Sequence, residues 1–257
     1  IMTLCQALVH PQAPDHARVC VAFTPDEEIG RGADLFDVPG FGAEYAYTVD
    51  GGALGEIEYE NFNAASAEVR IHGVNIHPGS AKHTMRNASL LAMEFHAMLP
   101  PQETPAFTEG YEGFYHLTRI QGREELCTLH YILRDHDMPK FLEKKARLEK
   151  IAAYLNEKYP PGTVEVTLTD TYYNMKEQLL GHMHIVEKAK AAMLACGVSP
   201  RVQPIRGGTD GARLSFMGLP CPNLSTGGYN FHGRRELISI QAMDTMVEVL
   251  LSLAQNA

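Results

Sequence analysis

Residues 62–172 carry the most regular alternation of apolar and polar positions in the chain. Apolar side chains occupy every second position from Ala65 to Ile71, which is typical of a half-buried strand, and recur at spacings of three and four in two later stretches, which predicts helices. The expected elements are, in chain order, a strand over 65–71, a helix over 88–98, strands over 114–120 and 126–134, a helix over 141–155 and a strand over 164–168. This β-α-β-β-α-β order predicts a ferredoxin-like α+β domain, an antiparallel sheet with helices on one side.

The segments on either side of this domain have shorter apolar runs, separated by Gly, Pro and Asp. The expected elements are strands over 19–23, 45–49 and 56–60 before it, and helices near 187–196, 210–217 and 241–254 after it. We expect 1–61 and 173–257 to form one α/β domain that residues 62–172 interrupt. The first ten residues have the pattern of a helix interior, so we also expect the chain to begin inside that domain.

Composition narrows the class of protein. Of the 257 residues, 45 % are hydrophobic and 21 % are charged, which is typical of a folded domain. A net charge of −9 without a dense Lys/Arg cluster argues against nucleic acid as a partner. The five cysteines are scattered and lack a C-x-x-C spacing, which favours reduced thiols in a cytosolic protein. The sequence contains neither an apolar run of about 20 residues, as a membrane span requires, nor a signal segment.

The sequence Thr24-Pro-Asp-Glu-Glu28 places two adjacent carboxylates directly after the apolar run 18–23. Catalytic residues of open α/β sheets gather beyond the carboxyl ends of strands. Two glutamates there can divide the work, one binding a metal and the other moving a proton. The alternative is a solvated acidic loop that caps a helix beginning near Ile29.

Two further candidates lie on loops of the same predicted domain. Asp50 precedes Gly51-Gly52 at the end of an expected strand, where a simple turn aspartate is the alternative. His232 lies in a glycine-rich loop, where it could donate to zinc or be exposed to water. Together with the glutamate pair, these residues predict a hydrolytic metal site.

The candidates for substrate binding are less distinctive. His77 follows the first strand of the ferredoxin-like domain, and a turn residue positioned by Pro78 is the alternative. Arg134 ends a strand, where an ion pair with Asp135 is the alternative. Arg206, in the stretch Arg206-Gly-Gly-Thr-Asp210, could bind a carboxylate or belong to a tight turn before a helix.

Six segments, in order along the chain, resemble those of the peptidase T family. This family comprises tripeptide aminopeptidases and belongs to the dizinc exopeptidases, with carboxypeptidase G2 and aminoacylase-1. The segments are Val21-Ala-Phe-Thr-Pro-Asp-Glu-Glu28, Tyr47-Thr-Val-Asp-Gly-Gly52, His77-Pro-Gly-Ser-Ala-Lys82, Tyr111-Glu-Gly-Phe-Tyr115, Arg206-Gly-Gly-Thr-Asp-Gly211 and Gly228-Tyr-Asn-Phe-His232. The resemblance implies a zinc-exopeptidase-like catalytic α/β domain, here partial, interrupted by a lid and dimerisation domain at 62–172.

The resemblance also implies a role for each candidate. Glu27 would be the general base, Glu28 and His232 would hold one zinc, and Asp50 would help to hold the other. His77 would reach the active site of the partner subunit in a homodimer and stabilise the oxyanion. Arg134 and the loop from Arg206 to Asp210 would bind the polar ends of a tripeptide.

The metal ligands that the family places upstream of the glutamate pair have no match in this chain. The family supplies a His-x-Asp motif and a bridging Asp there, but His10 is followed by Pro-Gln and His16 by Ala-Arg. Catalytic zinc usually has three protein ligands and a water. We therefore expect two zinc ions per complete site, an incomplete site in this chain, and a central sheet with one exposed edge.

The leading hypothesis is a cytosolic tripeptide aminopeptidase represented by a truncated chain with impaired activity. A related aminoacylase or dipeptidase of the same family is the enzymatic alternative. A non-catalytic fragment that forms dimers through residues 62–172 is the alternative from another class.

Overall fold

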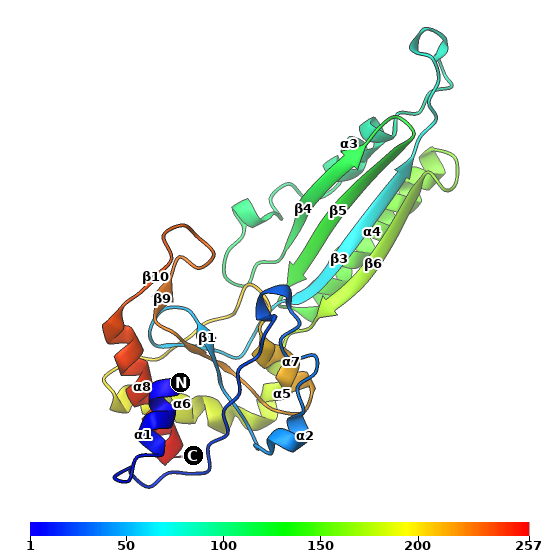
Figure 1. Ribbon diagram of the computed structural model, residues 1–257. Coiled ribbons are helices and arrows are strands. Elements are labelled where there is room, and N and C mark those ends of the chain that lie inside the picture. Colours follow the sequence, from blue (N-terminus) through cyan, green and yellow to red (C-terminus); the bar gives the residue numbers. More distant parts are fainter. Residues whose placement is uncertain (257) are drawn as a thin grey trace. The chain divides into compact units, whose positions relative to one another are not determined.

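A computed structural model describes residues 1–256, and the chain divides into two compact units. The first unit contains Ile1–Asn61 and Asn174–Ala257, and the second contains Phe62–Tyr173. Each combines helices with a sheet, which confirms the α/β class (Figure 1).

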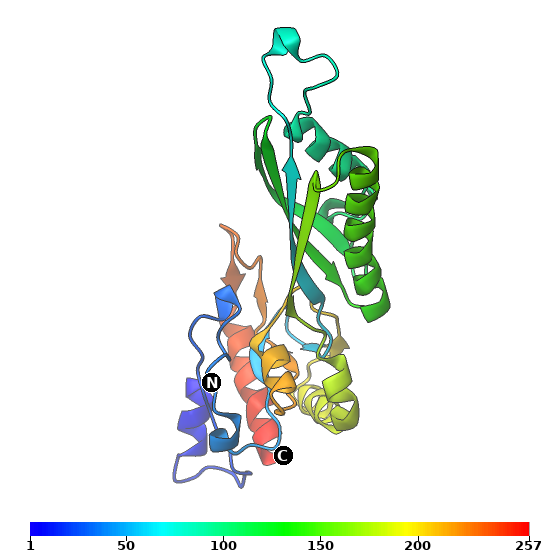
Figure 2. The same ribbon diagram turned by 90° about the vertical axis from the view of Figure 1, so that its right-hand side faces the viewer.

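The second unit is a four-stranded antiparallel sheet with two main helices. Its strands are β3 (Asn63–His72), β4 (Phe114–Gly122), β5 (Leu126–Asp135) and β6 (Val164–Tyr172), in the spatial order β4-β5-β3-β6. Its helices are α3 (Ala88–Ala97) and α4 (Met138–Lys158), with short 3₁₀ turns at Pro78–Ser80 and Pro105–Phe107. Both α-helices lie on the same side of the sheet (Figure 2). The ferredoxin-like prediction is confirmed in element order and topology.

The alternation that predicted β3 also builds the core of this unit. Ala65, Val69 and Ile71 are fully buried and pack in one cluster with Phe95 of α3 and Phe141 of α4. Both helices begin at a side-chain cap. The Asn87 side chain accepts hydrogen bonds from the amides of the first turn of α3, and the Asp137 side chain accepts one from the amide of Lys140.

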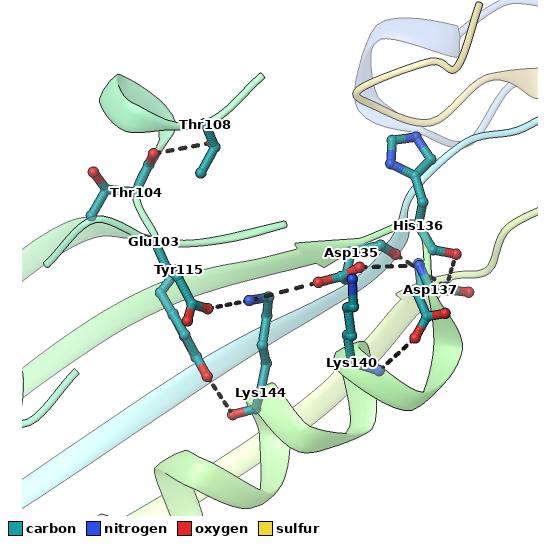
Figure 3. A network of polar contacts seen from close by, with 10 residues as sticks. Glu103, Thr104, Thr108, Tyr115, Asp135, His136, Asp137, Lys140 and Lys144 are labelled. Atoms are coloured by element: carbon teal, nitrogen blue, oxygen red, sulfur yellow. Dashed lines mark hydrogen bonds and ion pairs between the residues drawn. The ribbon is translucent and has the colours of Figure 1, made fainter. Parts of the chain in front are cut away.

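A buried ion pair joins α4 to the segment before β4 (Figure 3). The Lys144 ammonium contacts the Glu103 carboxylate and lies 3.6 Å from Asp135. Its aliphatic stem and charge also pack against Tyr115, whose ring centroid lies 5.1 Å from Nζ and whose hydroxyl donates to the Lys144 carbonyl at 3.3 Å. Burial raises the pKa of Asp135, so its carboxylate depends on Lys144 for a counter-charge.

The first unit has shorter elements. The helical ones are α1 (Met2–Leu8), a 3₁₀ turn at Glu27–Ile29, α2 (Val38–Phe41), α5 (Lys176–Leu179), a 3₁₀ turn at Leu180–His182, α6 (Met183–Ala195), α7 (Asp210–Phe216) and α8 (Ile240–Gln255). The strands are β1 (Thr48–Gly51), β2 (Glu56–Glu58), β7 (Arg201–Val202), β8 (Asn223–Ser225), β9 (Gly228–Tyr229) and β10 (Leu237–Ile238). Among the residues described, no helix is both long and apolar enough to cross a bilayer.

The main sheet of this unit has the order β1-β8-β2-β7, and β9 and β10 form a separate antiparallel pair. β1 runs parallel to β8, while β2 is antiparallel to β8 and parallel to β7. The core contains Ile57 of β2, Leu224 of β8, Val186 of α6 and Val249 of α8, all fully buried. The predicted helices near 187–196, 210–217 and 241–254 correspond to α6, α7 and α8.

One predicted strand of this unit is wrong, and so is the helix that the alternative interpretation of the glutamate pair assumed. Residues 19–23 form no strand, and the helix expected from Ile29 is only the 3₁₀ turn at Glu27–Ile29. A strand needs a neighbour about 4.8 Å away to pair its backbone. An open cavity of about 680 Å³ instead separates residues 17–24 from 43–50, and in the part of the chain described β1 pairs on one side only, with β8. Figure 1 accordingly shows the dark-blue segment that follows α1 as an irregular coil.

The cysteines are all free thiols, as the sequence predicts. Cys127 and Cys221 are buried, and the other three are partly exposed.

Candidate active site

The two glutamates lie on a tight turn rather than at the end of a strand. Asp26, which precedes them, has a left-handed backbone with φ of 63°, and Gly30 closes the turn with φ of 70°. Non-glycine residues adopt this conformation at a cost, and such residues are enriched at functional sites. Glu27 is half-buried and Glu28 is exposed, so the two neighbours occupy different environments. The Asp26 side chain does not cap the turn, so the capping interpretation of this stretch finds no support.

Glu28 and His232 are in contact although 204 residues separate them. His232 Nε2 lies 3.0 Å from one Glu28 carboxylate oxygen and 3.3 Å from the other. The His232 backbone is also left-handed, with φ of 61°, and its amide donates to the Glu236 carboxylate at 2.9 Å. The geometry brings together two side chains of the kinds that bind divalent metals.

Asp50 lies in β1 where the pairing with β8 is irregular. The register passes from Val49 opposite Leu224 to Gly51 opposite Ser225, so Asp50 is the extra residue of a β-bulge. Its backbone amide donates to the side-chain oxygen of Asn223 at 3.1 Å.

Four carboxylates and His232 form one electrostatic cluster. Partial burial raises the pKa of Glu27, the charges of Asp50, Asp210 and Glu28 raise it further, and His232 lowers it. The pKa of Asp50 is likewise raised, first by burial and then by Asp210 and Glu28. Like charges that raise one another's pKa in this way favour a bound cation or proton between them.

Asp210 is buried and holds the loop that carries the glutamates. Its carboxylate accepts a 2.7 Å hydrogen bond from the Thr24 hydroxyl. It also lies so close to Gly32 that a Cβ there would meet Asp210 Oδ2 at 2.1 Å. Sequence reasoning missed Thr24. The available signal was its position directly before the acidic turn.

These side chains are of the types that bind divalent metals, but too few of them converge on one point. An imidazole and several carboxylates are suitable donors for zinc. Among residues 1–256, however, no three His, Cys, Asp or Glu side chains converge closely enough to hold an ion.

The other residues predicted from the sequence are distributed over both units. Arg206 is half-buried in the connection between β7 and α7 of the first unit. His77 and Arg134 belong to the second unit. His77 is exposed and its Nδ1 accepts from the Gly79 amide at 3.1 Å. Arg134 donates to the carbonyls of Ala65 and Leu133, and its guanidinium lies over the Tyr172 ring.

Comparison with known proteins shows which proteins the chain resembles. Residues 59–163 match the sequence model described as Peptidase dimerisation domain. The chain is 58 % identical to peptidase T of Aeromonas salmonicida over 96 % of its own length, and 55 % identical to peptidase T of Caldanaerobacter subterraneus over 99 %. The chain is thus similar to peptidase T over almost its whole length. It spans 61–62 % of the length of these peptidase T relatives.

Solved structures show the same fold. A tripeptidase from Staphylococcus aureus aligns with a TM-score of 0.79 and 19 % identity, covering 91 % of this chain and 62 % of that one. Aminopeptidase PepT from Bacillus cereus aligns with a TM-score of 0.75 and 23 % identity, covering 90 % and 62 %. The resemblance to the peptidase T family that the six segments indicated is confirmed by the sequence identity to the peptidase T relatives, and the solved structures add the fold.

Proposed function

We propose that this chain carries part of the catalytic centre of a tripeptide aminopeptidase. The observation that carries the proposal is the contact of Glu28 with His232 beside the mutually repelling carboxylates of Glu27, Asp50 and Asp210. The peptidase T relatives support the reaction class, and the solved neighbours described as a tripeptidase and an aminopeptidase support the substrate class.

Glu27 is the general base of this proposal. Its pKa is raised, which makes its carboxylate a better proton acceptor at neutral pH than an ordinary surface glutamate. It would take a proton from the water that attacks the first peptide carbonyl and return that proton to the leaving amine.

Glu28 and His232 would hold one metal ion, and Asp50 would help to hold a second. We propose zinc, because imidazole nitrogen and carboxylate oxygen are among its usual donor atoms. The chemistry that an ion held by these residues would supply is a lowered pKa of a bound water and polarisation of the substrate carbonyl. The Glu28–His232 contact would then be exchanged for contacts of each side chain with the ion.

Substrate binding is assigned to His77, Arg134, Arg206 and Asp210. The two arginines offer guanidinium groups to the carboxylate of a tripeptide. In Asp210, Oδ2 is engaged by Thr24, so its remaining oxygen would be the one to accept from a substrate. The match to a peptidase dimerisation domain over 59–163 supports a homodimer formed through the second unit, and a cytosolic location fits the free thiols.

The test compares this chain alone with the chain joined to the remaining part of the Aeromonas salmonicida peptidase T. We expect the joined protein to bind two zinc ions and release the N-terminal residue of tripeptides. Glu27→Gln in the joined protein should lower kcat by about 10²–10⁴-fold and leave zinc stoichiometry unchanged. Two tightly bound zinc ions and full activity in the 257-residue chain alone would refute the incomplete site.

A substrate panel separates the alternatives. Faster cleavage of N-acyl amino acids or dipeptides than of tripeptides by the joined protein would favour the related aminoacylase or dipeptidase. A folded, zinc-loaded dimer that cleaves none of these substrates would favour the alternative of a non-catalytic, dimer-forming fragment.

A further inference from the structure

Because of the bulge in β1, the backbone amide of Asp50 donates its hydrogen bond to a side chain and not to the backbone of the neighbouring strand. In the parallel ladder with β8, Val49 and Gly51 face consecutive residues of β8, so Asp50 has no Cα partner. Its amide donates instead to Asn223 Oδ1 at 3.1 Å. Bulges commonly re-aim a side chain beside an active site, and this one turns the Asp50 backbone toward Asn223.

Asn223 is itself held from the other side by β2. It lies on the central strand β8, is 2 % exposed, and pairs in register with Glu58. Its Nδ2 donates to Glu58 Oε2 at 2.6 Å. Because a carboxylate only accepts hydrogen bonds, Glu58 fixes the amide nitrogen on its own side and the amide oxygen toward Asp50.

The packing below the bulge agrees with this arrangement. A Cβ at Gly51 would meet the Leu224 carbonyl at 2.8 Å and Glu58 Oε2 at 3.2 Å. The glycine after Asp50 therefore leaves the space that the Glu58 carboxylate occupies. The contact runs across three neighbouring strands, from Glu58 of β2 through Asn223 of β8 to Asp50 of β1.

We propose that Asn223 and Glu58 are positioning residues for Asp50, with Glu58 locking the Asn223 amide in the orientation that holds the bulge. The importance for metal binding rests on the proposed function, in which Asp50 is a ligand. The hydrogen-bond part of the proposal stands without it. A rotated Asn223 amide would place its NH₂ against the Asp50 N–H, which leaves both donors without acceptors at a side chain that is itself buried.

Four variants of the 257-residue chain separate the contacts. Glu58→Gln keeps an acceptor oxygen for Asn223. Glu58→Leu removes it. Asn223→Asp places a second carboxylate against Glu58. The double variant Asn223→Asp/Glu58→Gln restores the pair with donor and acceptor exchanged, and it changes almost no volume.

The first measurement is the hydrogen-exchange rate of the Asp50 amide by NMR at pH 8, with circular dichroism as the check on folding. We expect faster exchange in Glu58→Leu and Asn223→Asp, and rates near wild type in Glu58→Gln and in the double variant. Unchanged exchange in both disruptive variants, or a double variant no slower than Asn223→Asp, would overturn the proposal. The isosteric double variant remains decisive if Glu58→Leu does not fold.

The second measurement is zinc affinity by titration of the same variants, made in the joined protein because the 257-residue chain is expected to hold an incomplete site. Loss of a group that orients a metal ligand typically lowers affinity about 10- to 100-fold. We expect a loss of about 10-fold in Asn223→Asp and recovery in the double variant. If wild type binds no zinc, the proposed function fails while the exchange measurement still decides the positioning. If Asn223→Asp binds zinc as tightly as wild type does, the proposed effect on the metal site is refuted. The hydrogen-bond part of the proposal is then still decided by the exchange measurement.

Discussion

The two units of this chain use the same kinds of element at very different lengths. The second unit has strands of nine or ten residues and a helix of 21 residues, α4, whereas the strands of the main sheet in the first unit have two to four residues. The second unit closes its own sheet over one core. The first has an open cavity beside β1 and carries the clustered carboxylates. Regular packing and chemistry are thus divided between the units, so each should respond to different substitutions.

The largest effect is expected from removing the counter-charge in the second unit. Lys144→Ala leaves the Asp135 carboxylate, 3 % exposed, without its cation, which should lower the free energy of unfolding by about 3–5 kcal/mol. Urea denaturation followed by circular dichroism measures it. The matched control is Lys190→Ala in the first unit, whose exposed pair with Glu187 should contribute about 0.2–0.5 kcal/mol. Equal losses of unfolding free energy in Lys144→Ala and Lys190→Ala would contradict the contrast between the two units.

Truncation of one buried aromatic side chain tests the same contrast between the two units, now through packing instead of charge. Phe141 of α4 is fully buried, so Phe141→Ala should destabilise the second unit by about 3–4 kcal/mol through lost burial and the cavity left behind. Phe23 in the unpaired segment is 66 % exposed, so Phe23→Ala should change stability by about 0.5 kcal/mol or less. Thermal unfolding of both variants gives the comparison. A large loss in Phe23→Ala would mean that residues 17–24 pack more firmly than they do here.

The first unit should be the one whose stability depends on pH near neutrality. Burial raises the pKa of Glu58 from 4.5 to about 7, against the lowering effect of the Asn223 hydrogen bond. Because the folded pKa lies above the unfolded one, this contribution is fully present below about pH 4.5 and is lost as pH rises through 7. The loss should be on the order of 3 kcal/mol.

Thermal unfolding between pH 5 and 8 measures this dependence, and Glu58→Gln is the matched variant because it cannot titrate. We expect a flatter profile in Glu58→Gln. An identical slope in both proteins would assign the pH dependence to other groups, such as Glu27 and Asp50, whose pKa values are also raised.

The same contrast explains what the sequence could predict. Alternation from Ala65 to Ile71 is a local property, and the long strand it predicted is present as β3. The apolar run 19–23 has similar side chains, but a strand also needs a partner, and the cavity takes that place here. Propensity alone could not reveal the missing neighbour.

The site residues likewise divide into those that the sequence could predict and those that it could not. Glu28 and His232 were identifiable from their segments, yet their 3.0 Å contact depends on folding across 204 residues. Asn223 and Glu58 were missed because their role arises from strand pairing. The one local signal was a polar Asn within the apolar run 219–224.

The smallest effect is expected at Thr24, which joins the irregular loop to the regular part of the first unit. Thr24→Val keeps the shape but removes the hydroxyl that donates to Asp210, leaving a buried carboxylate oxygen without that bond. The loss should be about 1–2 kcal/mol. Thr24→Ser retains the donor and should stay within about 0.5 kcal/mol of wild type. Hydrogen exchange in residues 24–30 should rise in Thr24→Val alone, since the bond anchors the turn that carries Glu27. If exchange rises in Thr24→Ser and stays at the wild-type rate in Thr24→Val, packing of the Thr24 methyl group, rather than its hydroxyl, holds the glutamate turn in place.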